Sequence, residues 1–380
     1  MVALVTNKRS GLADIKHNAH RQMTDTKDIE NLRSEIDQID DSLLKLFNER
    51  ARTAMKVGDQ KPGQKADIVY RPEREAQILQ RLQRANNGPL GSEAVERLFR
   101  EIISICRATE AKPSIATLGP DGTFSELATR KQFGLEIDLK LTSSIEEVFR
   151  LVEADHCDFG VVPVENSAEG GIHLTLDRLL TTSLKISGEV DLRIKHCLIG
   201  SAGNTSPTKV LAHQQALAQC RQWLDVNLPS SERVACASNS DAVRQVLDNP
   251  TCVAIAAGEA ADAFGLQILQ ADIEDQPGNT TRFLVLGRHS VLPSGRDKTS
   301  LVMSAQERPG ALHALLEPLS YHNINMTRVE SRPSRTEMWE YMFFIDIEGH
   351  VQNSNVESAL SQMKANAAMF KVLGSYPRSI

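Results

Sequence analysis

The chain has 380 residues, a formal net charge of −6 and six cysteines. This length is sufficient for about two to four domains, each with its own hydrophobic core. No run of lysine and arginine is long enough to form a surface for nucleic acid or for an anionic membrane, so we expect small molecules and other protein chains as partners. The cysteines are scattered without close pairs, which argues against a disulfide framework and against a CxxC metal or redox site.

The N-terminal segment, residues 1–27, contains several cations but lacks the continuous apolar core of a secretory signal. No apolar run long enough to cross a membrane follows it. We therefore interpret residues 1–27 as a polar, mobile tail, and we expect the protein to reside in the cytoplasm without membrane contact.

The apolar residues after residue 28 recur at alternating steps of three and four, which predicts a long helix that packs in the manner of a coiled coil. The helix is expected to end near Lys61, because a Pro-Gly pair follows. Pro72 suits the first position of a second helix, and Ser92 suits the N-cap of a third. Residues 28–110 are therefore predicted to form an all-α helical module.

After residue 112, short apolar strands alternate with helical stretches, which predicts an α/β domain with largely parallel sheets. This domain, residues 113–290, is long enough for two lobes with a cleft between them. The Gly-x-Gly-x-x-Gly fingerprint of dinucleotide-binding folds is absent from the whole sequence. The strand candidates are 114–118, 159–164, 210–213, 233–237 and 252–256.

A polar break at 292–297 separates a third region, residues 298–376. Its pattern predicts strand, helix, strand, strand, helix and strand, which is the order of the α+β ferredoxin-like fold. The expected strands are 299–304, 325–332, 341–347 and 370–374, and the expected helices are 309–321 and 356–365. The predicted fold class is therefore multidomain, with an all-α module, a two-lobed α/β domain and a ferredoxin-like domain.

Charged residues stand on faces of the helical module where apolar residues are expected. Arg50 occupies a seam position of the long helix, and Lys61 lies on nearly the same face. Glu75 and Glu110 extend the apolar stripes of the second and third helices into the interior, where charges need partners. The residues could form a buried salt-bridge network or a polar layer that sets the helix register.

The helical module resembles the all-helical class of chorismate mutases. The resemblance lies in Arg33, Arg50, Lys61 and the segment 71–75, which reads Arg-Pro-Glu-Arg-Glu. It implies a dimer whose long helices interlock, so that Arg33 reaches into the site of the partner chain. The residues that it implies for the site of their own chain are Arg50, Lys61, Arg74 and Glu75.

The chemistry of a chorismate mutase suits these residue types. Chorismate carries two carboxylates, which guanidinium groups bind through paired hydrogen bonds. The rearrangement to prephenate is pericyclic and needs no nucleophile, but its transition state builds negative charge on the breaking ether oxygen. Lys61 would stabilise that charge as a preorganised donor.

Three positions depart from the pattern of this family. Glu110 stands where a neutral amide often faces the ether oxygen, Cys106 stands where a hydroxyl lines the pocket, and Arg71 stands where some members have an acid. A carboxyl group donates a hydrogen bond only when it is protonated. We therefore hypothesise that a protonated fraction of Glu110 serves as donor and that mutase activity falls as the pH rises.

Two segments of the α/β region combine a strand end with polar side chains. Residues 119–125 (Gly-Pro-Asp-Gly-Thr-Phe-Ser) follow a strand and open a helix, so that Thr123, Ser125 and backbone N–H groups could form an anion site. Residues 163–171 bring polar side chains to the C-terminal end of another strand, where ligands of open α/β sheets bind. Taken singly, helix capping and turn formation explain such motifs equally well.

Further polar groups lie at the element boundaries 213–215, 238–240 and 279–283. Together and in this order, the motifs resemble those of prephenate dehydratases over residues 113–288. The resemblance implies two lobes around a cleft and an essential Thr281 in a Thr-Arg-Phe motif. The other cleft residues that it implies are Glu165, Asn166, Ser167, His213, Gln215, Arg282 and Phe283.

Prephenate must lose its ring hydroxyl and carbon dioxide together, and aromatisation drives the step. An enzyme for this reaction has to help hydroxide leave and to bind two carboxylates without quenching the electron flow. Thr281 can donate a hydrogen bond to the departing oxygen. Glu165 and His213 are titratable alternatives, and the sequence does not rank them.

The C-terminal region resembles the ACT domain of phenylalanine-regulated enzymes through the segments 308–313 (Arg-Pro-Gly-Ala-Leu-His) and 330–333 (Glu-Ser-Arg-Pro). A glycine in the first segment lets backbone N–H groups approach an amino-acid carboxylate. Asn323 and Asn325 could bind the amino group from a neighbouring chain. The expected phenylalanine site comprises Gly310, Ala311, Leu312, Asn323, Asn325, Glu330, Ser331, Arg332 and Pro333. Without the resemblance, the region reads as a small α+β interaction domain.

The sequence thus predicts a homodimeric or larger enzyme without cofactor or metal, which converts chorismate to prephenate and then to phenylpyruvate and which L-phenylalanine inhibits. Three other classes compete. A two-lobed binding protein would gain nothing from the second anion site in the helical module. A mutase fused to prephenate dehydrogenase would need the missing dinucleotide fingerprint. A purely structural helical dimer leaves the cleft motifs unexplained.

Overall fold

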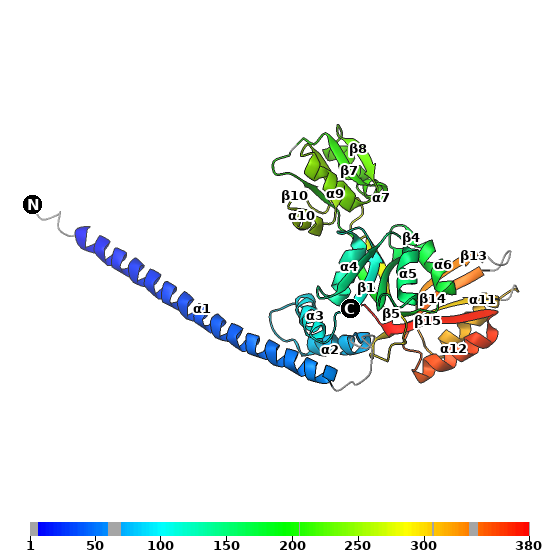
Figure 1. Cartoon of the computed structure of the whole chain (residues 1–380). Coiled ribbons are helices and arrows are strands. Elements are labelled where there is room, and N and C mark those ends of the chain that lie inside the picture. Colours follow the sequence, from blue (N-terminus) through cyan, green and yellow to red (C-terminus); the bar gives the residue numbers. More distant parts are fainter. Residues whose placement is uncertain (1–6, 60–69, 205, 306–307, 334–340, 380) are drawn as a thin grey trace, which may run out of the picture. The chain divides into compact units, whose positions relative to one another are not determined.

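The computed structural model describes residues 7–59, 70–204, 206–305, 308–333 and 341–379, and for residues 7–27 it describes the backbone alone (Figure 1). The chain divides into two compact units, residues 1–62 and 63–380. None of the helices in the described residues is both long enough and apolar enough to cross a membrane. All six cysteines are free thiols, and five of them are buried.

The described part of the first unit is a single helix, α1 (Asn7–Asp59). It begins well before residue 28, so residues 7–27, which the sequence analysis interprets as a tail, are helical. That stretch contains no proline and several residues of good helix propensity, such as alanine, lysine and arginine. The predicted helix end at Lys61 lies outside the described residues.

The apolar seam of α1 is exposed in this chain, with exposed fractions between 41% and 58%. The predicted coiled-coil packing of this seam stays a prediction. The seam residues are Ile29, Leu32, Ile36, Ile39, Leu43 and Leu46.

Helices α2 (Pro72–Ala85) and α3 (Ser92–Ala108) pack against each other in the second unit. Pro72 occupies the first turn of α2, as predicted, since its missing N–H costs nothing there. The N-cap of α3 is Gly91 and not Ser92. That prediction was wrong by one residue.

The first α/β lobe is built on a six-stranded sheet. Its order is β2 (Asp138–Thr142), β1 (Ser114–Leu118), β3 (Phe159–Asn166), β11 (Thr280–Gly287) and β5 (Lys185–Arg193), and the two-residue β4 (Gly170–Gly171) pairs with β3. Its helices are α4 (Phe124–Phe133), α5 (Ile145–Glu153) and α6 (His173–Thr181).

The second lobe is inserted between β5 and β11. Its sheet has the order β10 (Gln267–Gln270), β6 (Cys197–Gly200), β9 (Cys252–Ala256), β7 (Lys209–His213) and β8 (Glu232–Cys236). Its helices are α7 (Gln214–Gln219), α8 (Arg221–Asn227), α9 (Asn239–Asp248) and α10 (Glu259–Phe264).

The prediction of largely parallel sheets was wrong, because both sheets are mixed. In the first lobe β11 runs antiparallel to both β3 and β5, and in the second lobe β6 runs antiparallel to β9 and β10. The chain leaves the first lobe at the end of β5 and returns at the start of β11. Since Arg193 pairs with Thr280, β11 must run back along β5 in the opposite direction.

The C-terminal region has the predicted order of strands and helices. Its sheet order is β13 (Met326–Pro333), β14 (Tyr341–Glu348), β12 (Asp297–Ser304) and β15 (Met369–Pro377). Helices α11 (Ala311–Tyr321) and α12 (Ser354–Asn366) cover one face, where Leu315 and Met363 pack on Leu301 and Ile345.

The opposite face of this sheet packs on the first lobe. Val302, Phe344 and Tyr376 share a hydrophobic cluster with Ile186 and Leu284 of the first lobe. Both faces of the sheet are thus covered at its inner strand β12, which is buried along nearly its whole length, whereas every second residue of the edge strand β13 is exposed. The first-lobe sheet is a middle layer, because Tyr70 and residues of α4 cover its other face.

Candidate active site

A cavity of about 310 Å³ lies between the two α/β lobes, and both lobes contribute to its wall. It takes residues from the end of β3, from the start of β11 and from the first turns of α4, α7 and α9. Seven of the predicted dehydratase residues line it: Thr123, Ser125, Asn166, His213, Gln215, Thr281 and Phe283.

Thr281 and Asn166 form the polar centre of this wall. They are opposite each other on β11 and β3, both are buried, and the Asn166 Nδ2 donates to the Thr281 Oγ1 over 2.8 Å. The Asn166 Oδ1 accepts from the backbone N–H groups of Ala168 and Glu169, which orients the amide. Because the threonine oxygen accepts this bond, its own proton remains available to a ligand.

Thr123 is the N-cap residue of helix α4. Its Oγ1 accepts from the Glu126 N–H over 3.4 Å and donates to the Leu118 carbonyl over 3.0 Å. The Glu126 carboxylate accepts from the Gly122 N–H over 2.6 Å. A carboxylate of the chain therefore already uses part of the anion site that the sequence predicts here.

His213 caps helix α7. Its Nδ1 accepts from the Gln215 N–H over 3.3 Å, and its backbone N–H donates to the Asn239 side chain over 2.8 Å. Since Nδ1 is an acceptor, Nε2 is the ring nitrogen that carries the proton in the neutral imidazole. His213 is exposed and lines the cavity, so Nε2 is a second candidate donor.

Sequence reasoning missed His196, which also lines the cavity. The ring is 2% exposed, its Nε2 is 2.8 Å from the Gln219 Oε1, and it meets the Phe124 ring edge-on at 5.6 Å between centroids. Burial lowers the pKa of His196 below its ordinary value, which favours a neutral ring. His196 belongs to no recognisable motif, because it stands alone between β5 and β6.

Three predicted cleft residues do not line the cavity: Glu165, Ser167 and Arg282. Ser167 joins two loops, since its Oγ accepts from the Thr280 N–H and donates to the Asn279 Oδ1. Glu165 and Arg282 are the strand neighbours of Asn166 and Thr281. Because successive side chains of a strand point to opposite faces, they project away from the cleft.

The mutase residues fall into different parts of the structure. Arg33 and Arg50 belong to α1, Lys61 lies outside the described residues, and the others belong to the second unit. Arg71 and Arg74 are exposed at the start of α2, Cys106 is buried and Glu110 is half-buried. The members of the second unit are Arg71, Arg74, Glu75, Cys106 and Glu110.

Glu75 is buried, as its position on the apolar stripe predicts, and its charge has a partner that the sequence analysis missed. Arg107 donates to the Glu75 Oε1 over 2.5 Å and to the Phe133 carbonyl over 2.5 Å, and its guanidinium lies over the Tyr70 ring at 5.2 Å. The pair joins α2 and α3 to the end of α4. Arg107 therefore places a compensating cation against the buried Glu75 carboxylate.

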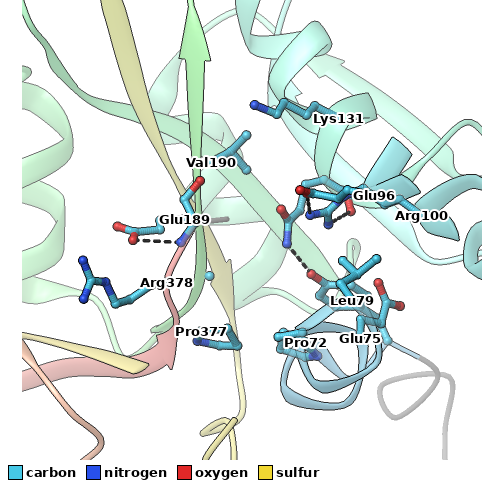
Figure 2. Close-up of a pocket in the computed structure, with 15 residues that line it drawn as sticks. Pro72, Glu75, Leu79, Glu96, Arg100, Lys131, Glu189, Val190, Pro377 and Arg378 are labelled. Atoms are coloured by element: carbon cyan, nitrogen blue, oxygen red, sulfur yellow. Dashed lines mark hydrogen bonds and ion pairs between the residues drawn. The ribbon is translucent and has the colours of Figure 1, made fainter. Parts of the chain in front are cut away.

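Glu75 also borders a small cavity among α2, α3, α4, β5 and the C-terminal residues 377–379 (Figure 2). The wall carries the ion pair between Glu96 and Arg100, at 2.5 Å. Its volume of about 30 Å³ admits only one or two water molecules and excludes a substrate the size of chorismate. At this size the cavity is part of the packing of α2 and α3 against the first lobe.

The predicted phenylalanine residues lie around α11 and on β13. Gly310 caps α11 with φ 76°, and Asn323 has φ 53°, so both adopt the left-handed conformation. Arg332 on β13 donates to the Asp177 carboxylate over 2.8 Å and to the His173 carbonyl over 3.0 Å. Its guanidinium is therefore already bound to α6 of the first lobe.

Among the residues that the structure describes, no group of three or more histidine, cysteine, aspartate or glutamate side chains could hold a metal ion. Besides neutral hydrogen-bond donors, the lining of the cleft contains the titratable side chains of Glu169, His196 and His213.

Family models match three successive parts of the chain. Chorismate mutase type II matches residues 32–111, prephenate dehydratase matches residues 115–291, and the ACT domain matches residues 299–365. A bifunctional chorismate mutase/prephenate dehydratase from Stutzerimonas stutzeri is 46% identical over 94% of this chain and 100% of that protein. The chain belongs to this family.

A second bifunctional chorismate mutase/prephenate dehydratase, from Neisseria gonorrhoeae, is 47% identical over 92% of this chain and 96% of that protein. A solved prephenate dehydratase from Arthrobacter aurescens, in complex with L-phenylalanine, is 33% identical, with a TM-score of 0.64 over 70% of this chain and 90% of that chain. The family and the multidomain fold class predicted from the sequence are confirmed.

Proposed function

We propose that this chorismate mutase/prephenate dehydratase family member converts chorismate to prephenate with its helical residues 28–110 and prephenate to phenylpyruvate in the cleft of residues 113–290. The observation that carries the second activity is the buried Thr281–Asn166 pair in a cavity of about 310 Å³. The amide donates to the threonine oxygen, so the threonine proton is directed to a bound substrate.

In the dehydratase step the bond between the ring and its carboxylate breaks, and its electron pair moves into the ring. The ring becomes aromatic, and hydroxide leaves from the opposite carbon, takes up a proton and departs as water. A donor that stabilises the charge on the departing oxygen lowers the barrier. Thr281 is the proposed donor, and His213 Nε2 is the second candidate.

The lack of cations in the cavity wall suits this step. Among the described residues that line it, none is an arginine or a lysine, and one, Glu169, is acidic. A cation next to the ring carboxylate would stabilise the ground state more than the transition state, because that negative charge is lost as carbon dioxide forms. The position of Arg282 outside the cavity fits this requirement.

The first test supplies chorismate to the purified full chain without any nicotinamide cofactor and follows the ultraviolet absorbance of phenylpyruvate. We expect prephenate to appear first and phenylpyruvate to follow. Prephenate that accumulates and stays unconverted would contradict the dehydratase, and unchanged chorismate would contradict the mutase.

The proposed mutase site draws on Arg33 of one chain and on residues of the other, which requires a homodimer. The exposed apolar seam of α1 supports this proposal. Glu110→Gln tests the proposed protonated donor, because an amide keeps the hydrogen bond at every pH and should flatten the pH profile. In the proposed mutase site, one chain supplies Arg33 and the other chain supplies Arg50, Lys61, Arg71, Arg74, Glu75 and Glu110.

The proposed effector is L-phenylalanine, bound by the ACT region at residues 310–312, 323–325 and 330–333. The Arthrobacter aurescens relative in complex with L-phenylalanine supports this assignment. Inhibition would follow if phenylalanine prefers one arrangement of the ACT region over another. Calorimetry that detects no binding of phenylalanine would contradict it. The cytoplasm remains the proposed location.

A further inference from the structure

Two residue pairs lie back to back on β3 and β11. Thr281 is opposite Asn166, and the next residues, Arg282 and Glu165, are opposite each other. The first pair lines the cavity between the lobes. The second pair projects toward the C-terminal sheet, because neighbouring side chains of a strand alternate between its faces.

Arg282 is held by two residues of the C-terminal sheet and by one residue of β5. Its guanidinium donates to the Asp346 Oδ2 over 2.5 Å, to the Tyr376 hydroxyl over 2.9 Å and to the Glu189 Oε2 over 2.9 Å. The side chains of Arg282, Asp346 and Glu189 are 12%, 5% and 2% exposed. At this burial each charge depends on the others, so the cluster keeps one geometry.

The lowered pKa of Asp346 agrees with a close interaction between its carboxylate and the Arg282 guanidinium. Burial alone raises the pKa of its carboxyl group, but the Arg282 guanidinium and the Ser300 hydroxyl outweigh burial and hold that pKa below its ordinary value. Asp346 on β14 and Arg282 on β11 thus form a charged pair at neutral pH.

Glu165 has a parallel connection to the same sheet. Its Oε2 is 2.7 Å from the Arg328 Nε on β13, and the Arg328 guanidinium also contacts Glu330. Glu330 opens the Glu-Ser-Arg-Pro segment that the proposed phenylalanine site includes. Arg328 therefore stands between a carboxylate of the proposed effector site and a carboxylate next to Asn166.

We propose that Arg282 and Glu165 are positioning residues, through which the ACT sheet sets the separation and orientation of Thr281 and Asn166. Neither side chain lines the cavity, so both act through their strand neighbours and not on the substrate. Arg328 is the point of regulation, since its guanidinium binds Glu165 and Glu330 at the same time through different nitrogens. This inference rests on the proposed dehydratase function and adds the route by which an effector reaches it.

The shared guanidinium gives the route a direction. An effector that binds at β13 and displaces Glu330 also displaces the Arg328 side chain, which weakens the ion pair of Arg328 with Glu165. A loosened Glu165 frees the end of β3, and Asn166 then no longer holds the Thr281 hydroxyl at its bonding distance. Small displacements of a reacting group are sufficient for a large loss of rate.

The test uses Arg328→Gln, Glu165→Gln and the double variant in the full chain. Each single variant should lower the dehydratase kcat about tenfold, as expected for a misplaced catalytic group, and leave KM nearly unchanged because no substrate contact is lost. The double variant should be no worse than the poorer single variant, since both remove the same interaction. Arg328→Gln should also weaken inhibition by phenylalanine.

Arg150→Gln is the matched control. Arg150 makes a 2.6 Å ion pair with Glu147 on α5, but its side chain is 59% exposed and does not line the cleft. We expect no change in kcat or in inhibition for this variant. The mutase kcat, measured on the same samples, serves as an internal reference for the amount of active protein.

Two results would overturn the inference. Single variants with wild-type dehydratase kcat and wild-type inhibition would show that the ion pair does not position the cleft. A parallel fall in mutase kcat, or a lowered melting temperature that accounts for the loss, would show a merely structural role. Arg282→Lys adds a second probe, because lysine keeps the positive charge but cannot make the three hydrogen bonds to Asp346, Tyr376 and Glu189. A wild-type chain that makes no phenylpyruvate would contradict the proposed function instead.

Discussion

The cleft between the two lobes and the long helix α1 differ in whether a single chain supplies the contacts that their side chains need. In the cleft, Thr281, Asn166 and His196 have hydrogen-bond partners from the same chain. Along α1 the apolar seam is 41–58% exposed. Complete burial of such a side chain contributes about 1.5–3 kcal/mol, so the seam is a source of association free energy. One site is thus built within a chain, whereas the other is proposed to need a second copy.

The strongest way to break this comparison is to abolish association alone. The double variant Ile36→Asp/Leu43→Asp places charges in the apolar seam, where their burial would destabilise the association of two α1 helices. We therefore expect a monomer by light scattering. Mutase turnover should fall about a thousandfold, since Arg33 no longer reaches the site of a partner chain. Dehydratase turnover should persist. Lys45→Asp, a charge change at another position of α1, is the control. A dimeric or mutase-active double variant would contradict the proposed interlocked dimer.

The reverse experiment removes the proposed donor of the cleft. Thr281→Ala should lower dehydratase kcat about a hundredfold or more, because the departing oxygen loses its hydrogen bond, while mutase turnover is unchanged. Thr280→Ala is a matched control, since the Thr280 hydroxyl bonds locally to the Gly278 carbonyl. Near-normal phenylpyruvate formation by Thr281→Ala would remove this residue from the mechanism.

The buried pair of Glu75 and Arg107 tests whether α2 and α3 depend on the α/β lobe. Arg107→Gln removes the cation that pairs with the buried Glu75 carboxylate and also loses the bond to Phe133, so the free energy of unfolding in urea should fall by about 3 kcal/mol. The exposed pair of Arg150 and Glu147 should contribute less than about 1 kcal/mol in the same assay. Equal effects of the two substitutions would contradict a stabilising role for the buried pair.

The smallest effect concerns His196. Its folded-state pKa is lowered, so the unfolded chain binds the additional proton more readily. This contribution to stability is fully present above the ordinary histidine pKa of about 6.5 and is lost as the pH falls through the lower folded-state pKa. Between pH 7.5 and pH 5, His196→Gln should lose about 2 °C less in melting temperature than the wild type. An identical loss in both proteins would show that His196 does not titrate in this way.

Several elements followed from local patterns because local physics decides them. Pro72 starts α2, since its fixed φ and missing N–H suit only a first turn. The strands and helices of the C-terminal region appear in the predicted order, because alternating and helical periodicities distinguish them. The start of α1 was not predicted, because residues 7–27 are polar and lack the apolar periodicity of the rest of the helix.

The sequence by itself determined the order of the elements, the family and the residue types of the cleft. It placed Arg282 beside Thr281 but could not assign their faces, because the strand's direction and partners depend on residues far along the chain. Only the tertiary structure paired Arg282 with Asp346, Glu165 with Arg328 and Glu75 with Arg107. Buried charges choose their partners by proximity in space, and that proximity exists only once the sheets and helices have packed.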